Sequence, residues 1–476
     1  MDSTQQVLNI FEQLSAIPRG SGREAQISRW LQERAAQHGF SSATDEAGNL
    51  VIRVPATAGY ESAPVIILQG HMDMVCEKTP DSPHDFSKDP IRCIVDGDWL
   101  HADRTTLGAD NGIAIALGLA LAENASVARP ALELLFTVQE EAGLGGANLL
   151  QPGFISGKIL LNLDSEDEGT FIVGCAGGQG THIRLPFTAG VPLNKTGYKL
   201  RVAGLRGGHS GVDIHKHYAS ANKLIARVLF HLNKTAPLSL MSLNGGMAHN
   251  AISRTAEATF ACAAGDGLAL EEVVRNFERI LNNEYSASES GITLTLTPVE
   301  VTRAATEADT AKMLGLLMAL PHGVAEMSAS VAGFVETSNN LAHLEIDEDA
   351  LKIATSQRST VMTRMEELTE RIMAMARLAG AEVHSNPAYP GWQPEMKSAL
   401  LQRSVETYQA VFGVAPRVQM IHAGLECGTI GAIYSGLDMI SLGATIENPH
   451  SPGERMYIPS VGKVWQYLVE FLQAYH

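Results

Sequence analysis

The sequence predicts an α/β fold in which helices cover both faces of a mostly parallel sheet. Its composition, with 45% apolar and 18% charged residues over 476 positions, is that of a globular protein. Continuous apolar strands alternate with helices over the first 185 residues, a pattern typical of parallel sheets buried on both sides. Carboxylate and imidazole side chains follow three of these strands, so a ligand site is expected at that edge of the sheet.

The first part of the chain provides the elements of this sheet. Apolar periodicity predicts helices over Gln5–Leu14 and Glu24–Gln37, separated by a glycine-rich break. Small apolar residues predict a further helix from about Gly112 to Ala122. Short apolar runs predict buried strands at Pro64–Leu68, Leu132–Val138 and Lys158–Leu163.

The pattern changes near Pro186. Strands with more alternation, such as Tyr198–Val202, are interleaved with helices near His217–Phe230, Leu270–Asn283 and Thr360–Leu378, which predicts an α+β insert with its own core. We therefore expect a catalytic domain in two parts, residues 1–185 and 386–476, and an inserted lid and dimerisation domain, residues 186–385. No internal repeat is evident in the sequence.

Charge and cysteine content exclude several classes of protein. The 35 Lys and Arg against 52 Asp and Glu give a net charge of −17, whereas a nucleic-acid binder needs a basic face. The five cysteines are scattered without a C-x-x-C pair, so neither a disulfide framework nor a thiolate zinc site is expected. The first residues lack a signal segment, and the longest near-apolar run is too short to span a membrane. We expect a soluble cytoplasmic protein without nucleic-acid or membrane partners.

Side chains with metal-binding chemistry gather at the ends of the predicted strands. Each of them alone has an ordinary interpretation as a surface pair, a solvated charge or a helix cap. Together, unpaired carboxylates would repel one another unless a cation neutralised them, so a metal centre explains the cluster. Nitrogen and oxygen ligands suit Zn²⁺, and Mn²⁺ or Co²⁺ could substitute for it. The residues are His71, Asp73, Asp110, Glu140, Glu141 and Asp164.

Several sequence motifs resemble those of one enzyme superfamily. HMDMV, LGADNG, the QEE–G run and LNLDSE, in this order and spacing, are similar to motifs of the co-catalytic zinc metallopeptidases, which include carboxypeptidases, dipeptidases and aminoacylases. The longer stretches IPRGSGRE, GGHSGVDIHKHYASANK, YPGWQP, IHAGLECG and GATIENPHSP narrow the resemblance. They resemble the bacterial aminoacyl-histidine dipeptidases, also called Xaa-His or cytosol non-specific dipeptidases. The resemblance covers essentially the whole chain.

The resemblance implies a centre with two zinc ions in each subunit. His71 and Asp164 would bind one zinc, Glu141 and His450 the other, and Asp110 would bridge them. Asp73 would orient the imidazole of His71. The family also has a cis peptide bond after its bridging aspartate, which here is the Asp110–Asn111 bond.

The resemblance further implies that Glu140 is the general base of a hydrolysis in which a metal-bridging hydroxide attacks the peptide carbonyl. Because neighbouring side chains at a strand end point apart, Glu141 could face the metal while Glu140 faces the substrate. The G-x-S-x-G motif of serine hydrolases is absent, and no cysteine lies in a recognisable nucleophile motif.

The insert contains further predicted site residues. In the resembled family, His209 would reach the active site of the partner subunit and stabilise the oxyanion, although a turn histidine is the simpler interpretation. Asn250 and Arg358 match substrate-contacting positions, and an arginine suits a C-terminal carboxylate, although Arg358 could equally be a surface residue. Beyond the insert, Glu426 would meet the substrate amino group. His215 and His217 are expected on a helix face, and Trp99 and His101 have no assigned role.

The leading hypothesis is therefore a homodimeric zinc dipeptidase that hydrolyses unblocked dipeptides, with Xaa-His and β-Ala-His among its substrates. An aminoacylase-like deacylase or a tripeptide aminopeptidase on the same core is the second hypothesis. A non-catalytic binding protein with a relict metal site is the third. Retention of all five ligand-type residues together with Asp73 and Glu140 argues against it.

Overall fold

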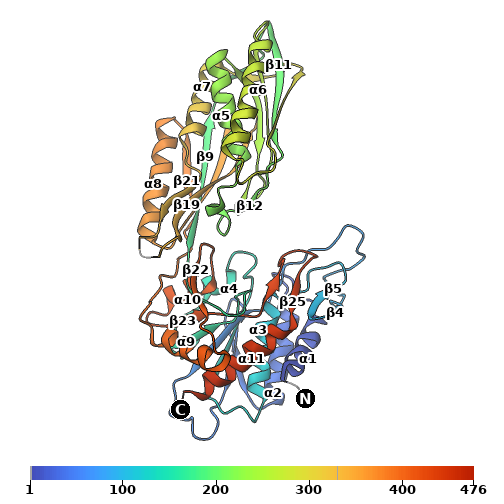
Figure 1. Ribbon diagram of the computed structural model, residues 1–476, viewed down its shortest axis with the longest axis vertical. Helices are drawn as coiled ribbons and strands as arrows, with labels where there is room; N and C mark the ends of the chain where they lie inside the picture. Colours follow the sequence, from blue (N-terminus) through green and yellow to red (C-terminus); the bar gives the residue numbers. More distant parts are fainter. Residues whose placement is uncertain (1–2, 330, 476) are drawn as a thin grey trace. The chain divides into compact units, whose positions relative to one another are not determined.

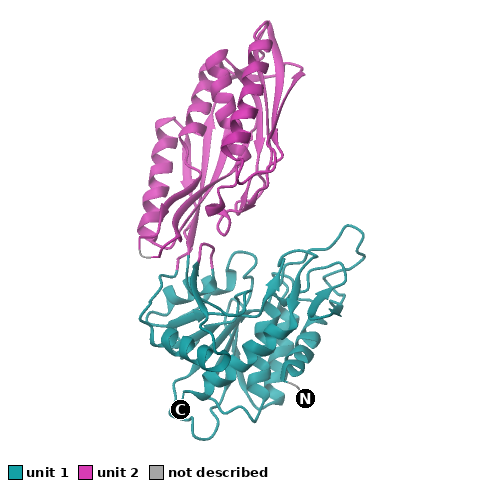
Figure 2. Cartoon of the chain, in the orientation of Figure 1, with its two compact units in different colours: residues 1–175, 392–420, 425–476 teal, residues 176–391, 421–424 magenta. Residues whose placement is uncertain are grey.

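The computed structural model describes residues 3–329 and 331–475, which form two compact units. Unit 1 comprises Met1–Cys175, Trp392–Met420 and Leu425–His476, and unit 2 comprises Ala176–Gly391 and Ile421–Gly424 (Figure 2). Unit 2 starts earlier than the predicted boundary at residue 186 because strand β9 (Gly177–Pro186) pairs with β20 (Ala350–Ser359) in the sheet of unit 2. The short segment 421–424, which also belongs to unit 2, was not predicted.

The core of unit 1 is an eight-stranded mixed sheet (Figure 1). Its centre, β6-β3-β7-β23, is parallel, as the sequence analysis expected, whereas β1, β2 and β8 pair antiparallel at its edges. In spatial order the strands are β1 (Ser41–Thr44), β2 (Leu50–Val54), β6 (Leu132–Thr137), β3 (Ile66–His71), β7 (Ile159–Asn162), β23 (Asp438–Ser441), β8 (Thr170–Cys175) and β22 (Arg417–Ile421).

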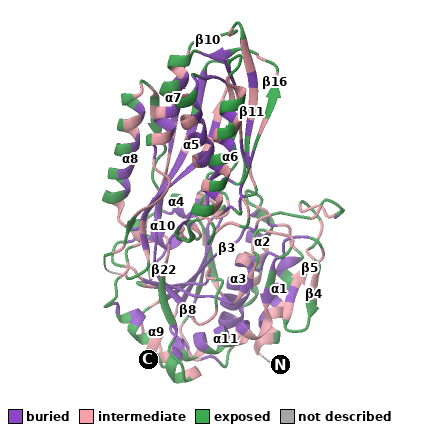
Figure 3. Ribbon diagram, turned by 45° about the horizontal axis from the view of Figure 1, so that its top comes forward, coloured by how far each residue is buried: buried purple, intermediate pink, exposed green. Residues whose placement is uncertain are grey.

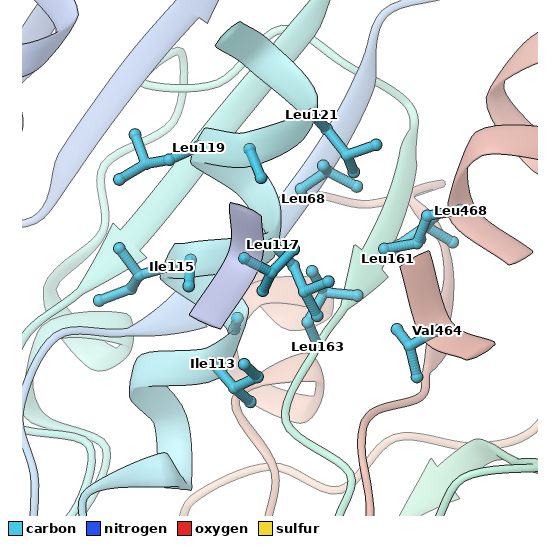
Figure 4. Packing of buried hydrophobic residues seen from close by; sticks show 14 of the residues in the cluster. Leu68, Ile113, Ile115, Leu117, Leu119, Leu121, Leu161, Leu163, Val464 and Leu468 are labelled. Carbon is cyan, nitrogen blue, oxygen red and sulfur yellow. The ribbon is translucent and has the colours of Figure 1, made fainter. Parts of the chain in front are cut away.

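Helices cover both faces of this sheet because its strands alternate two sets of apolar side chains. On β3, Leu68 belongs to the larger cluster and Ile67 to the smaller cluster on the opposite face. The larger cluster packs against α1 (Ser3–Ser15), α2 (Ala25–Gln37), α3 (Ala109–Glu123), α9 (Ala399–Phe412) and α11 (Ile458–Gln473). The smaller cluster packs against α4 (Gly145–Leu149) and α10 (Glu426–Ile433). Figure 4 shows Leu68 and Leu161 of the sheet among Leu117 of α3 and Leu468 of α11.

Helix α3 runs through the core and is almost entirely buried, which agrees with its small apolar sequence. It lies so close to β3 that a Cβ on Gly70 would come within 2.3 Å of Asn111 Oδ1 and 2.6 Å of Ala114 Cβ. This close approach brings the start of the helix to the end of β3. The structure contains the expected cis peptide bond between Asp110 and Asn111.

A second sheet in unit 1 carries the loop that contains His450. Its strands are β24 (Ile446–Glu447), β25 (Arg455–Tyr457), β5 (Trp99–Ala102) and β4 (Cys93–Asp96). Trp99, to which the sequence analysis assigned no role, packs against Tyr457 and lies under the guanidinium of Arg455. His101 is paired with Arg455 in the same sheet. Both residues therefore support the strand that follows the His450 loop.

Unit 2 contains a repeat of topology that the sequence did not reveal. Each half has the order strand, helix, strand, strand, helix, strand, and in each half the strands are arranged 4-1-3-2 across the sheet. The halves join where β13 pairs antiparallel with β19. The first half is β11 (Lys195–Ala203), α5 (Ala221–Thr235), β13 (Ser239–Gly245), β15 (Ala256–Ala263), α6 (Gly267–Glu284) and β16 (Thr293–Val299). The second is β9, α7 (Glu307–Ala319), β19 (Val335–Ile346), β20, α8 (Met362–Leu378) and β21 (Glu382–Ser385).

The four helices α5 to α8 pack on one face of the unit 2 sheet (Figure 1), where they share one apolar cluster with it. Figure 3 shows that the exposed residues of α8 face away from the sheet. The expected helix near His217–Phe230 begins only at Ala221, because Ile214–Lys216 form a 3₁₀ turn and His217 has a positive φ of 55°. Among the described residues, no helix is both long and apolar enough to cross a membrane.

Candidate metal centre

Five segments of unit 1 bring the predicted ligand residues together. The strand β3 ends at His71, the strand β7 is followed by Asp164, and Asp110 lies at the start of α3. The turn after β6 carries Glu141, and the loop between β24 and β25 carries His450. These residues form two sets, and within each set the ligand atoms all lie within 4.8 Å of one another. The first set is His71, Asp110 and Asp164. The second set is Asp110, Glu141 and His450.

The carboxylate of Asp110 lies between the two sets. Its Oδ1 is 3.1 Å from His71 Nε2, and its Oδ2 is 3.1 Å from His450 Nε2. His71 Nε2 is 3.4 Å from Asp164 Oδ1, and His450 Nε2 is 3.1 Å from Glu141 Oε1. Atoms bound to one tetrahedral Zn²⁺ at about 2.0–2.2 Å lie roughly 3.4 Å apart. Both sets therefore have the size of a metal-ligand set, and Asp110 faces both.

The electrostatics of the cluster also suit cations. Burial raises the pKa of Asp164 to about 6, and burial raises the pKa of Glu140 well above its usual value. Hydrogen bonds to Asp110 and Glu141 raise the pKa of His450 to about 11. Within the described residues, the buried oxygens Glu141 Oε1 and Asp164 Oδ1 have no nearby hydrogen-bond donor apart from the Nε2 atoms of His450 and His71, at 3.1 and 3.4 Å. The cluster thus has an excess of negative charge and unused lone pairs, which two divalent cations would neutralise and occupy.

Asp73 connects the imidazole of His71 to the turn after β6. His71 Nδ1 lies 3.1 Å from the backbone carbonyl oxygen of Asp73 and 3.5 Å from its carboxylate. The carboxylate also accepts hydrogen bonds from the backbone N–H groups of Glu140 and Glu141, at 3.0 and 3.2 Å, and from the hydroxyl of Ser21. Asp73 is fully buried, so these contacts hold both the ring and the turn in place.

The sequence analysis assumed that Glu140 and Glu141 lie at the end of a strand, but in the structure they do not. The strand β6 ends at Thr137, and Gln139 adopts a positive φ of 53°, so the two glutamates belong to a turn. Their carboxylates do not point to opposite sides, since ligand atoms of His71, Glu140 and Glu141 lie within 4.8 Å of one another. Glu141 is distinguished from Glu140 by its contact with His450.

Two buried residues that the sequence analysis did not predict hold the Asp110 loop. Glu454 accepts four backbone hydrogen bonds, from Leu107, Gly108, Ala109 and Asp110, at 2.7 to 3.3 Å. Arg19 is also buried and donates to the backbone carbonyl oxygens of Met72, Asp73 and Gly108. Arg19 lies in the IPRGSGRE motif, and this membership is the signal that could have found it, whereas Glu454 lies two residues beyond the GATIENPHSP motif and had no such signal.

Two further carboxylates lie close to the cluster. Glu426, expected to meet the substrate amino group, is fully buried and accepts hydrogen bonds from Gln69 Nε2 at 2.6 Å and Thr137 Oγ1 at 2.7 Å. Its other oxygen, Oε1, has no hydrogen-bond partner among the described residues, and contact with the substrate amino group stays a prediction. Glu166 was not predicted. Partial removal of its carboxyl group from water raises its pKa to about 8, and the negative charges of Asp110 and Asp164 act in the same direction.

The remaining predicted residues belong to unit 2. His209 lies on the short strand β12 (Gly208–His209), which pairs with β14 (Ala251–Ile252). Asn250 directly precedes β14 in the sequence. The backbone N–H groups of Gly211 and Val212 donate to His209 Nδ1, so the proton of the neutral ring lies on Nε2. Arg358 lies on β20 and is only 6% exposed, so it is not a surface residue.

The comparisons with known proteins agree with this geometry. Residues 198–289, within the first half of unit 2, match the family model described as a peptidase dimerisation domain. The chain is 40% identical over 479 residues to the cytosol non-specific dipeptidase of Escherichia coli strain K12, over 99% of this chain and 98% of that one.

Among solved structures, the aminoacylhistidine dipeptidase from Vibrio alginolyticus matches with a TM-score of 0.88 and 36% identity, over 99% of this chain and 96% of that one. A tripeptidase from Staphylococcus aureus matches with a TM-score of 0.58 and 17% identity, over 99% of this chain and 98% of that one, which shows a shared fold. By its whole-chain identity, the protein belongs to the M20 metallopeptidases, in the branch of the cytosol non-specific, or aminoacyl-histidine, dipeptidases.

Proposed function

We propose that this protein is a metal-dependent dipeptidase that hydrolyses unblocked dipeptides, with Xaa-His and β-Ala-His among its substrates. The observation that carries the proposal is the carboxylate of Asp110, which faces His71 with one oxygen and His450 with the other. The names of the two similar proteins, a cytosol non-specific dipeptidase and an aminoacylhistidine dipeptidase, support the substrate class. They also support a cytoplasmic location.

Two Zn²⁺ ions suit the two ligand sets, with His71 and Asp164 on one, Glu141 and His450 on the other, and Asp110 on both. When bound, such a pair supplies Lewis acidity toward water and the peptide carbonyl group. Glu140 lies beside the ligands without contacting His450, and its raised pKa suits a group that accepts and returns a proton. Its carboxylate would take a proton from the attacking water and deliver it to the nitrogen of the leaving amine.

Residues of unit 2 would bind the other parts of the substrate. The guanidinium of Arg358, with Asn250, suits the C-terminal carboxylate of a dipeptide. His209 carries its proton on Nε2, where it would donate a hydrogen bond to the developing oxyanion. The match to a peptidase dimerisation domain supports a homodimer, in which His209 would serve the site of the partner subunit.

The test uses metal-stripped protein reloaded separately with Zn²⁺, Mn²⁺ and Co²⁺. Reloading should restore hydrolysis of a dipeptide panel at two metal equivalents per chain. Full activity at one equivalent would contradict the proposal. Preferred hydrolysis of N-acyl amino acids or tripeptides would instead favour the aminoacylase-like or tripeptidase hypothesis. Metal binding without hydrolysis of any peptide would favour the non-catalytic hypothesis.

A further inference from the structure

His422 occupies a confined position in unit 2 that the proposed function does not explain. It lies on the segment Ile421–Gly424, through which the chain returns to unit 2 between two stretches of unit 1. The residue is only 6% exposed, and its ring packs edge-on against Phe334. A Cβ on Gly211 would come within 2.2 Å of the carbonyl oxygen of His422, so the loop that carries His209 lies directly against this segment.

The imidazole of His422 makes one close side-chain hydrogen bond, and the backbone of Val335 also lies near the ring. Its Nε2 lies 2.8 Å from the hydroxyl oxygen of Ser338. Its Nδ1 is buried and, within the described part of the chain, has no hydrogen-bond partner. Burial, and then the charge of Arg358, lower the pKa of His422 to about 3, so the ring is neutral over the physiological range. When the Ser338 hydroxyl donates to Nε2, the neutral ring carries its proton on Nδ1.

Arg358 also has a buried nitrogen without a hydrogen-bond partner among the described residues. The residue is 6% exposed, and its Nη1 donates to the hydroxyl of Tyr389 at 3.0 Å. Its Nε is buried without a partner among the described residues. Leaving a buried polar group unpaired is unfavourable, so such a group in a native protein needs an explanation, and binding of a ligand or a water molecule is one. The Nε–H of Arg358 and, in the tautomer in which Ser338 donates, the Nδ1–H of His422 suit an anionic acceptor with two oxygens.

We propose that His422 is a specificity-determining residue that, together with Arg358, binds the C-terminal carboxylate of the dipeptide. The inference rests on the proposed function for its substrate class. The Nδ1–H of His422 would donate to one carboxylate oxygen and the guanidinium of Arg358 to the other. Because the segment that carries His422 lies against the His209 loop, carboxylate binding and oxyanion binding would use adjacent parts of unit 2.

The test compares binding of a dipeptide and of its C-terminal amide by calorimetry. The protein is the metal-loaded Glu140→Gln variant, which leaves the ligand uncleaved. The variants added are His422→Gln, which lacks a donor at the Nδ1 position, and His422→Asn, whose side-chain amide can occupy that position. His343→Gln is the matched control, because the half-buried His343 in the same unit contacts the backbone carbonyl of Gly246 at 2.8 Å.

We expect the protein to prefer the free dipeptide over its amide. His422→Gln should weaken binding of the free dipeptide about tenfold to a hundredfold and leave binding of the amide nearly unchanged. His422→Asn should recover part of the loss, and His343→Gln should change neither affinity. Equal weakening for both ligands, no weakening, or no binding of the dipeptide at all would overturn the proposal. Selective binding by a wild-type protein that hydrolyses no peptide would overturn the proposed function alone.

Discussion

Asp110 is the residue on which both ligand sets depend. Each of its carboxylate oxygens faces a different histidine, and the residue is held through backbone contacts to Glu454. The carboxylates of Glu140 and Glu141, which are adjacent in the sequence, differ in the contacts that they make. Glu141 contacts His450, whereas the half-buried Glu140 lies among several negative charges without that contact. In the proposed function, this difference separates a metal ligand from a proton carrier.

The two adjacent glutamates should therefore give opposite phenotypes when replaced. Glu140→Gln should retain two metal equivalents and lose about 10²- to 10⁴-fold in kcat, because it removes a proton carrier and no ligand. Glu141→Ala should lose metal from one set. Metal analysis and steady-state kinetics on the same preparations measure both effects. Metal loss in the Glu140 variant, with metal retained in the Glu141 variant, would show that the roles are exchanged.

Glu426 should make the stability of the metal-free protein depend on pH. Burial raises its pKa to about 7 from the usual 4.5, so the folded state holds the proton more tightly than the unfolded chain does. The free energy of unfolding should then fall as the pH rises from 5 to 8. Glu426→Gln removes the ionisation. It should match the wild type at pH 5 and exceed it by about 3 kcal/mol at pH 8.

Denaturant unfolding of the metal-free proteins at both pH values measures this difference. Glu447→Gln serves as the control, since the side chain of Glu447 is 44% exposed and pairs with Arg455. The control should follow the pH dependence of the wild type. Parallel pH profiles for the wild type and Glu426→Gln would show that Glu426 does not carry the effect.

At the scale of elements, the candidate metal centre depends on hydrogen bonds that connect loops to the ends of strands. The strands β3, β6 and β7 are neighbours in the sheet, so their carboxyl ends meet at one edge. Asn111 adds a connection, because its side chain accepts from the N–H of His71 at 3.2 Å and donates to the carbonyl of Leu163 at 2.9 Å. The backbone N–H groups of the Asp110 loop in turn donate hydrogen bonds to the carboxylate of Glu454.

Removal of Glu454 should loosen this loop. Glu454→Ala leaves four backbone N–H groups without their acceptor and Arg19 without its nearest compensating charge. We expect a loss of about 3–5 kcal/mol in the free energy of unfolding, together with weaker metal binding. The exposed Glu447, replaced by Ala, should cost less than about 1 kcal/mol. Equal effects in the two variants, measured by denaturant unfolding and metal titration, would contradict this role.

At the scale of the whole molecule, the chemistry is divided between two units. Unit 1 holds the metal-ligand residues and Glu140, and unit 2 holds His209, Arg358 and His422. Within unit 2, His209 comes from the first half of the repeated topology, whereas Arg358 comes from the second half. Under the proposed function, substrate binding and catalysis would use residues from both units, which could belong to one chain or to two.

Subunit mixing distinguishes these two arrangements. Glu140→Ala and His209→Ala should each be inactive, and His209→Ala should keep its metal while losing about 10²- to 10³-fold in kcat. If His209 serves the partner subunit, a mixed dimer contains one site with both residues intact. Partial activity should then return after subunit exchange. No recovery in dimers shown to have exchanged would mean that His209 acts within its own chain.

The central strands and the ligand residues were predictable from the sequence because their signals are local. An apolar run followed at once by His71, Glu140 or Asp164 indicates both a buried strand and the chemistry at its end. The small apolar residues after Asp110 likewise indicate the buried helix α3. The resemblance to a known family added His450, which no local pattern connects to the other ligands.

Only the tertiary structure revealed the contacts that support these residues. Glu454 binds a backbone N–H that is 347 positions away in the sequence, and the Ser338–His422 contact spans 84 positions. The antiparallel edges of the first sheet and the repeated topology of unit 2 likewise depend on which strands pair. No short stretch of sequence encodes such pairings, because a buried carboxylate or imidazole is stable only where distant backbone and side-chain groups satisfy it.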